Sequence, residues 1–328
     1  MSEIDLPEEH GKSECRAAIP LVRLIRDRYN VAAWLIVMVI IFIDCIWMHC
    51  AGFTMAIASA ARSAMALLVL AGLTLVLHGI ARHNRYSEAV ARLRIMKVCV
   101  IAHAIVIVGF FTYAILILQY MCVALDRPLI DNDLIALDAA LGFSWRDLFM
   151  WQMRRADWSA VLSVIYLSYV PQVAITAVVL GGTGRTDDLA DFMLLFMLIA
   201  IFTILVSGLI PASNPLIHFG FIGPHDASPW SKFYPLREGS MTVISLDNGQ
   251  GLISIPSLHA AHAVLFAYAV RHVRWFFFIS IVWNLAMIYS AIPFGAHYLV
   301  DIIAGVAVSV LAIAAARYLA RRSDLVAK

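Results

Sequence analysis

The chain has 328 residues, of which 62% are hydrophobic and only 14% are charged, and its formal net charge is +2. A soluble domain carries about 25% charged residues, so this composition excludes an ordinary soluble protein and indicates a polytopic membrane protein. The near-neutral charge, with no basic stripe between exposed aromatic residues, argues against a nucleic-acid partner.

The five cysteines form neither a CxxC motif nor a metal-ligand spacing. Cys45 and Cys99 lie within apolar segments, and we interpret them as small buried hydrophobic residues. The first 30 residues mix acids and bases, and the first apolar run is long enough to remain a membrane anchor. No secretory signal is therefore expected.

Eight apolar segments are long enough to be candidate membrane-spanning helices, which need about 20 residues. They cover residues 31–51, 63–80, 97–122, 159–180, 189–210, 255–271, 275–292 and 297–319. Strand-like alternation is missing, so the expected fold class is all-α, a polytopic membrane helical bundle of about eight transmembrane helices. We expect a cytoplasmic segment (1–30), two peripheral helices (31–96), a six-helix catalytic core (97–319) and a cytoplasmic tail (320–328).

The orientation follows from the bias of Lys and Arg towards one side of the membrane. With the N-terminus in the cytoplasm, the cytoplasmic side receives the basic clusters, which are Arg23, Arg26, Arg28, Arg82, Arg85, Arg92, Arg94, Lys97, Arg271, Arg274, Arg317, Arg321 and Arg322. Both termini are therefore predicted to be cytoplasmic.

Two segments on the opposite, outer side have their own character. Residues 129–155 place Ile130, Leu134, Leu137 and Leu141 on one helical face, followed by Trp145 and Trp151. This pattern predicts an amphipathic helix in the membrane interface. Residues 211–254 form a long loop with Pro, Gly and Asn, and loops of that length are usually functional or disordered.

The sixth apolar segment begins with "IPSLHAAHA", residues 255–263, which places polar groups at the outer face. The eighth segment begins with "GAHYLVDIIAG" and returns His297 to the face that holds His259. Asp301 follows His297 by four residues, so the two side chains lie on one helix face.

These residue types suit phosphoryl transfer through a histidine. A carboxylate one turn away holds one imidazole nitrogen as a donor and leaves the other as a free lone pair. Pro256 suits the first turn of a helix, whose exposed amides favour anions, and Ser257 adds a hydroxyl there. His259 has no acid four residues later and is the less obviously activated histidine.

Plainer interpretations remain open for several polar groups within the apolar segments. His259 and His262 can hydrogen-bond neighbouring helices, and His78 and His103 are more often packed or interfacial residues. Asp44 has no obvious partner and suits packing or capping as well as function.

Two chemical questions also stay open at this point. His259, His297 and Asp301 are the residue types of a facial triad for iron or zinc. Lys232 and Arg237 are either phosphate ligands or ordinary solvated loop charges.

The motifs "PSLH" at 256–259 and "HYLVD" at 297–301 resemble the second and third signature motifs of the type 2 phosphatidic acid phosphatase superfamily. The resemblance covers roughly residues 97–319. It implies that His297 becomes phosphorylated, that Asp301 orients it, and that His259 protonates the leaving oxygen. It also implies that Ser257 helps to hold the phosphate.

The chain departs from the family pattern at two positions. Ala291 follows Ser290 where other members carry arginine, and "KFYPLREG" at 232–239 supplies only Lys232 and Arg237 of the first motif. The form of the motifs is closer to the inositol phosphorylceramide synthase branch, which implies headgroup transfer between lipids and polyols.

We therefore expect a metal-independent enzyme without a cofactor, acting on a phospholipid or sphingolipid-type substrate at the outer face, with a polyol as a possible acceptor. Hydrolysis of a lipid phosphate is the alternative reaction. A lipid or polar-solute transporter is the non-enzymatic alternative, although transporters tend to place ionisable groups on broken, repeated helices near the midplane. The sequence leaves the acceptor and the oligomeric state open.

Overall fold

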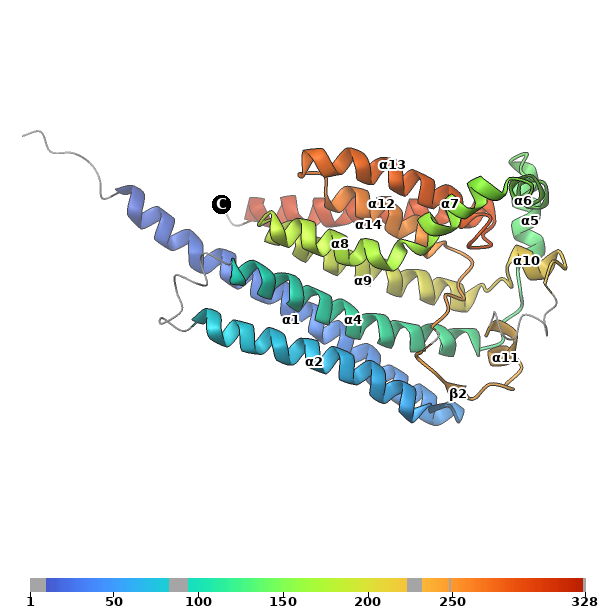
Figure 1. Cartoon of the computed structure of the whole chain (residues 1–328), viewed down its shortest axis with the longest axis horizontal. Coiled ribbons are helices and arrows are strands. Elements are labelled where there is room, and N and C mark those ends of the chain that lie inside the picture. Colours follow the sequence, from blue (N-terminus) through green and yellow to red (C-terminus); the bar gives the residue numbers. More distant parts are fainter. Residues whose placement is uncertain (1–9, 83–93, 223–231, 248, 327–328) are drawn as a thin grey trace, which may run out of the picture.

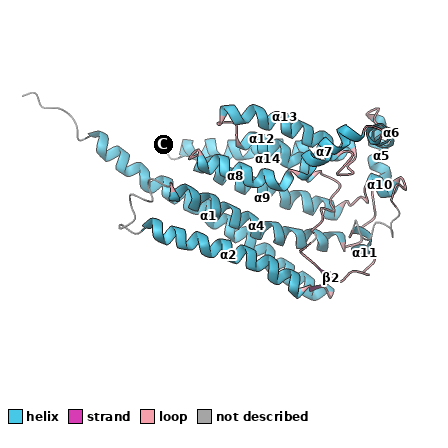
Figure 2. Ribbon diagram, viewed as in Figure 1, coloured by secondary structure: helices cyan, strands magenta, loops and turns pink. Residues whose placement is uncertain are grey.

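The computed structural model of the protein describes residues 10–82, 94–222, 232–247 and 249–326, with the backbone alone for 10–28, 82 and 323–326. Long helices run side by side along the molecule, and short helices and loops gather at one end (Figures 1 and 2). The expected all-α bundle is confirmed, because the described chain is mostly helical and its two strands have two residues each.

Each predicted apolar segment contains helix. The helices are α1 (His10–Ala51), α2 (Ile57–Arg82), α4 (Ile95–Val123), α7 (Ala156–Leu167), α8 (Tyr169–Gly182), α9 (Thr186–Leu209), α12 (Leu258–Ala269), α13 (Arg274–Ala291) and α14 (Leu299–Val326). The segment 159–180 is a pair of helices, α7 and α8, which meet at Ser168 with a bend of 54°.

Among the described helices, six are long and apolar enough to cross a membrane, or seven if the bent pair forms one span. The protein is thus a multi-pass membrane protein, with fewer full spans than the eight expected. The difference lies at α12, which has only 12 residues. The extended backbone and capping side chain of Ser257 start this helix late, and it ends at Ala269.

Two helices occupy the centre of the bundle. One of them, α4, packs against α1, α2, α8 and α9, and the other, α12, packs against α9, α13 and α14. Apolar side chains from these helices form the main core, which includes Phe111, Phe196, Leu265 and Phe266. By contrast, only 6% of the apolar window of α2 is buried, so this helix is a peripheral wall that faces the membrane.

The segment 129–155 is two short helices, α5 (Asp131–Ala140) and α6 (Trp145–Met153), at one end of the bundle (Figure 1). The residues predicted to share one apolar face divide between two environments, and their placement in the membrane interface stays a prediction. Leu137 and Leu141 are exposed, whereas Leu134 and Trp145 are only 1% and 2% exposed and pack into the protein. Contacts with the rest of the chain therefore position α5 and α6.

The long segment 211–254 contains α10 (Pro215–His218), α11 (Phe233–Arg237) and the strand β2 (Val243–Ile244). Strand β2 pairs in parallel with β1 (Thr54–Met55), in the turn between α1 and α2. Ser59 Oγ accepts hydrogen bonds from the backbone N–H groups of Leu246 (2.7 Å) and Asp247 (3.1 Å). These contacts attach the long segment to the first two helices.

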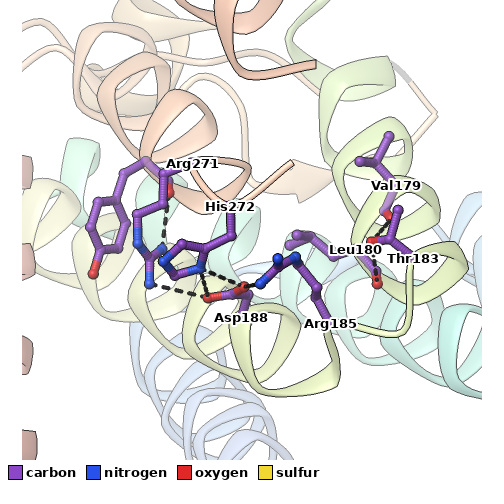
Figure 3. Close-up of polar contacts among 8 residues, drawn as sticks. Val179, Leu180, Thr183, Arg185, Asp188, Arg271 and His272 are labelled. Carbon is purple, nitrogen blue, oxygen red and sulfur yellow. Dashed lines mark hydrogen bonds and ion pairs between the residues drawn. The ribbon is translucent and has the colours of Figure 1, made fainter. Parts of the chain in front are cut away.

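At the end of the bundle away from α5 and α6, Asp188 in the first turn of α9 links this helix to the connection between α12 and α13 (Figure 3). Its carboxylate accepts from Arg271 (3.1 Å) and His272 (2.9 Å), which lie between α12 and α13, and contacts Arg185 at 3.5 Å. The side chains of Arg23, Arg26, Arg28, Arg82, Arg85 and Arg92, which support the orientation argument, lie outside the described residues. The cytoplasmic placement of the termini stays a prediction.

Candidate active site

The N-terminal ends of α12 and α14 meet at the end of the bundle that carries α5 and α6. The Ser257 N–H donates to the backbone oxygen of Asp301 at 2.9 Å. Gly305, one turn after Asp301, makes this approach possible, because a Cβ at that position would lie 2.3 Å from the Ser257 oxygen. The two motifs, some 40 residues apart, therefore form one site through direct backbone contact.

His297 and Asp301 make the contact that their spacing predicts. His297 Nδ1 lies 3.4 Å from Asp301 Oδ2, and both residues are buried. The same oxygen accepts from Ser254 Oγ at 2.7 Å and from the Tyr298 N–H at 3.0 Å. Because the carboxylate is an acceptor, Nδ1 carries the proton and Nε2 keeps its lone pair. The contact is long, as such contacts often are before substrate binds.

Two buried carboxylates of α5 hold the start of α14. Asp138 accepts from the backbone N–H groups of Leu299 and Val300, each at 3.0 Å. Asp131 accepts from the Tyr298 hydroxyl at 2.8 Å and from the Ser213 N–H at 2.8 Å. Burial raises the pKa of the Asp138 carboxyl, and the two backbone hydrogen bonds oppose that rise. The first backbone N–H groups of α14 thus donate to a side chain of the protein itself.

His259 lies between two tyrosine rings. Tyr166 stacks on it with 4.3 Å between ring centroids and 17° between planes, and the Tyr169 centroid lies 4.6 Å away. Tyr166 also borders His297: a Cβ on Gly295 would lie 2.8 Å from His297 Cδ2 and 3.0 Å from Tyr166 Cε2. Tyr166 therefore stacks on His259, and the edge of its ring lies near His297.

The two tyrosines lie at the break between α7 and α8, which is centred on Ser168. Ser168 Oγ donates to the Ile165 carbonyl at 2.6 Å. It accepts from Trp283 Nε1 at 2.8 Å and from Gln172 Nε2 at 3.1 Å. A serine that bonds to the preceding turn bends a helix, and here further donors hold the bend. Tyr166 and Tyr169 thus lie on either side of a fixed corner.

His262, one turn after His259, is occupied on both ring nitrogens. Nε2 lies 3.1 Å from the carbonyl oxygen of Phe196, which can only accept, so Nε2 donates. Nδ1 must then accept from the Tyr169 hydroxyl, 2.6 Å away. Because the residue is fully buried and both nitrogens are used, His262 has a packing role.

The sequence-predicted phosphate ligands are dispersed. Ser257 is fully buried and caps α12, where its Oγ lies 3.4 Å from the Ala260 N–H. Lys232 Nζ lies 3.4 Å from the Ser245 carbonyl. Arg237 pairs with Asp126 at 2.7 Å and lies beside the C-terminal end of α4. Phosphate contact by these three residues stays a prediction.

Two further features surround the turn before His297. Trp145 Nε1 donates to the Ile292 carbonyl at 3.0 Å and stacks on Phe149. Ala291, at the position where the family pattern has arginine, is fully buried in the same apolar cluster as Trp145. An arginine would not fit there without moving this cluster.

The sequence alone did not indicate that Asp131, Asp138, Tyr166, Tyr169 or Trp145 belongs to the site. Their partners lie far away along the chain, and no local spacing indicates them. The sequence does contain one usable signal: Asp131 and Asp138 are seven positions apart in α5 and therefore share a helix face.

A family model described as the PAP2 superfamily matches residues 132–315, which is more than half of the chain. The chain belongs to the PAP2 superfamily. The matched region runs from α5 into α14 and contains every residue of the site described above except Asp131. No match is found among curated proteins or among solved structures.

Membership of the PAP2 superfamily supports an enzyme of the lipid phosphatase or phosphotransferase type. The first three long helices, α1, α2 and α4, precede the matched region. Of these, α4 is part of the central core. Helices within the matched region therefore pack against a helix that lies outside it.

Proposed function

We propose that this protein is an integral-membrane lipid phosphotransferase that works through a phosphohistidine on His297, similar to inositol phosphorylceramide synthases. The observation that supports this most is the His297–Asp301 contact, which leaves Nε2 unprotonated. A second histidine, His259, stacks on Tyr166, whose ring lies near His297. A nucleophile and a separate proton donor are what two-step transfer requires.

In the first step, His297 Nε2 attacks the phosphorus of the lipid, and the bond to the leaving oxygen breaks. His259 gives that oxygen its proton, which releases an alcohol and leaves the phosphoryl-bearing group on His297. In the second step, His259 takes the proton of an acceptor hydroxyl, whose oxygen attacks the phosphorus. The phosphorus–nitrogen bond breaks, and His297 and His259 return to their starting states.

The charge around the site favours a phosphodiester donor. Three buried carboxylates, Asp131, Asp138 and Asp301, lie close to the nucleophile, and Ala291 supplies no cation. A phosphodiester headgroup with one negative charge suits such surroundings better than a dianionic monoester. We therefore propose a phospholipid or sphingolipid-type donor, with a polyol as one possible acceptor and lipid phosphate hydrolysis as the alternative.

The decisive experiment incubates the purified protein with radiolabelled phospholipid, with and without candidate polyols, and separates the products. We expect a new phosphodiester that appears only with an alcohol. An acid-labile label on the protein should be absent in His297→Gln and present in His49→Gln, whose histidine is exposed and far along the chain from the site motifs. Free phosphate as the only product would make the protein a phosphatase.

The same preparation distinguishes this enzyme from a transporter and from a metalloenzyme. Normal turnover in His297→Gln would exclude the phosphohistidine, and lipid flux across vesicles without a new product would favour a transporter. Activity is expected to survive EDTA, since the imidazole needs no cation to act as a nucleophile. Loss on chelation with recovery on one divalent ion would favour a metal site of His259, His297 and Asp301.

A further inference from the structure

A cavity of about 890 Å³ lies at the end of the bundle opposite to His297, between α1, α2, α4 and α9. Its walls come from the C-terminal half of α2 and the N-terminal turns of α4 and α9. These turns lie at the left in Figure 1, whereas α5 and α6 lie at the right. The volume falls within the range of sites for small organic ligands, roughly 300–1,000 Å³.

The described lining combines apolar side chains with neutral polar ones. The polar members are Asn30, Thr74, His78, His103 and Thr186, which come from all four helices. Lys, Arg, Asp and Glu are absent from the described lining. Such a wall offers hydrogen-bond donors and acceptors without a formal charge. It suits an amphiphile whose head carries hydroxyl or carbonyl groups.

The cavity reaches the membrane-facing surface. Leu75 and Met96 line it and are 73% and 40% exposed, respectively. The helices α1 and α2 are joined at the His297 end and diverge towards the other end (Figure 1). A lipid can therefore place its head among the polar groups while its chains stay in the bilayer beside α2.

The described lining offers no cation to an anionic head. Thr186 lines the cavity and is followed directly by Asp187 and Asp188 in the first turn of α9. The cations nearest to Asp188 in Figure 3, Arg185 and Arg271, are directed at its carboxylate. Both cations are already engaged and are not available to a phosphate at this position.

We propose that this cavity binds an uncharged, hydroxyl-bearing lipid of the diacylglycerol class, taken from the membrane leaflet at that end of the bundle. The site is formed mainly by helices that precede the matched PAP2 region, and it does not depend on the proposed phosphotransfer. It gives α1 and α2 a role beyond covering the core.

The test uses the purified full chain in nanodiscs and a diacylglycerol that carries a photoreactive group near its glycerol. After illumination, labelled peptides are expected from residues 70–81 and 95–104. His78→Phe and His103→Phe keep a ring but remove its nitrogens, so each should lower labelling about two- to tenfold, as the loss of one hydrogen bond would. Excess unlabelled diacylglycerol should compete.

Two further variants separate the cavity from the surface of α2. Ala190→Phe places a ring in the cavity and should lower labelling, whereas Val76→Phe, on the exposed face of α2, should leave it unchanged. In His297→Gln the labelling of residues 70–81 and 95–104 should be unchanged, which distinguishes this site from the catalytic one. Equal labelling by a phosphatidic acid or phosphatidylcholine probe, or labelling unaffected by both histidine variants, would overturn the proposal.

Discussion

The ring of Tyr166 lies almost flat against the ring of His259, with 4.3 Å between their centroids. The pair joins α7 to α12, and the same tyrosine borders His297 through the space at Gly295. Tyr166 thus fixes the orientation of the proposed proton donor with respect to the proposed nucleophile. We infer that it is a positioning residue.

Tyr166→Leu should lower kcat/KM about two- to twelvefold, because aromatic pairs contribute about 0.5–1.5 kcal/mol beyond their burial. Tyr166→Phe keeps the ring and should stay within about twofold of the parent. The measurement is the pH profile of purified protein. The limb that reports His259 should move in the leucine variant and not in the phenylalanine variant, and identical profiles would refute a positioning role.

His259 and His262 are expected to respond in opposite ways to substitution. His262→Phe removes two buried hydrogen bonds and leaves the Tyr169 hydroxyl and the Phe196 carbonyl without this partner, which should cost about 2–4 kcal/mol of stability. His259→Phe should unfold near the parent temperature but lose most turnover. Thermal unfolding and activity are measured on the same samples. A stable, inactive His262→Phe would show that His262 takes part in the chemistry.

Gly305→Ala should destabilise the protein and lower its activity. The new Cβ would lie 2.3 Å from the Ser257 backbone oxygen, so α14 must move away from α12, at a cost of about 1–3 kcal/mol. Gly72→Ala is the matched control, because its Cβ would meet nothing within 4 Å. Unfolding temperatures of the two variants decide the matter, and equal values would contradict the close approach.

Asp138→Ala should release the start of α14. It removes the acceptor for the Leu299 and Val300 N–H groups, and losing a helix cap costs about 0.5–2 kcal/mol. Because His297 directly precedes this turn, turnover should fall by more than the loss of folded protein explains. Asp133→Ala, an exposed position on the same helix, is the control. Similar activity in the two variants would rule out this role for Asp138.

Local patterns predicted the parts of the molecule that local geometry determines. Apolar runs located all eight helical segments, and the spacing of four residues predicted the His297–Asp301 contact. The motif pair also predicted that α12 and α14 meet. Each of these depends on residues within a few turns of one another, or on the alternation of sides along the chain.

Contacts between distant segments could not be predicted in this way. Asp138 caps a helix more than 150 residues later, and Tyr166 reaches His259 across more than 90 residues. The apolar spacing of 129–155 predicted a surface helix because it cannot distinguish a membrane surface from a protein surface. Trp145 and Leu134 are buried against the protein instead. The length of α12 was overestimated, since apolar composition does not mark where Ser257 begins the helix.

The pairing of β1 with β2 bears on where this chain can be shortened. Residues 242–247 are bonded to the turn after α1 and to Ser59 and Arg62 of α2, and α12 begins further along the chain, at Leu258. Removing the first 94 residues would therefore remove the hydrogen-bond partners of the segment that precedes the PSLH motif. The region that matches the PAP2 superfamily is thus attached to helices outside the match through the segment that precedes the site.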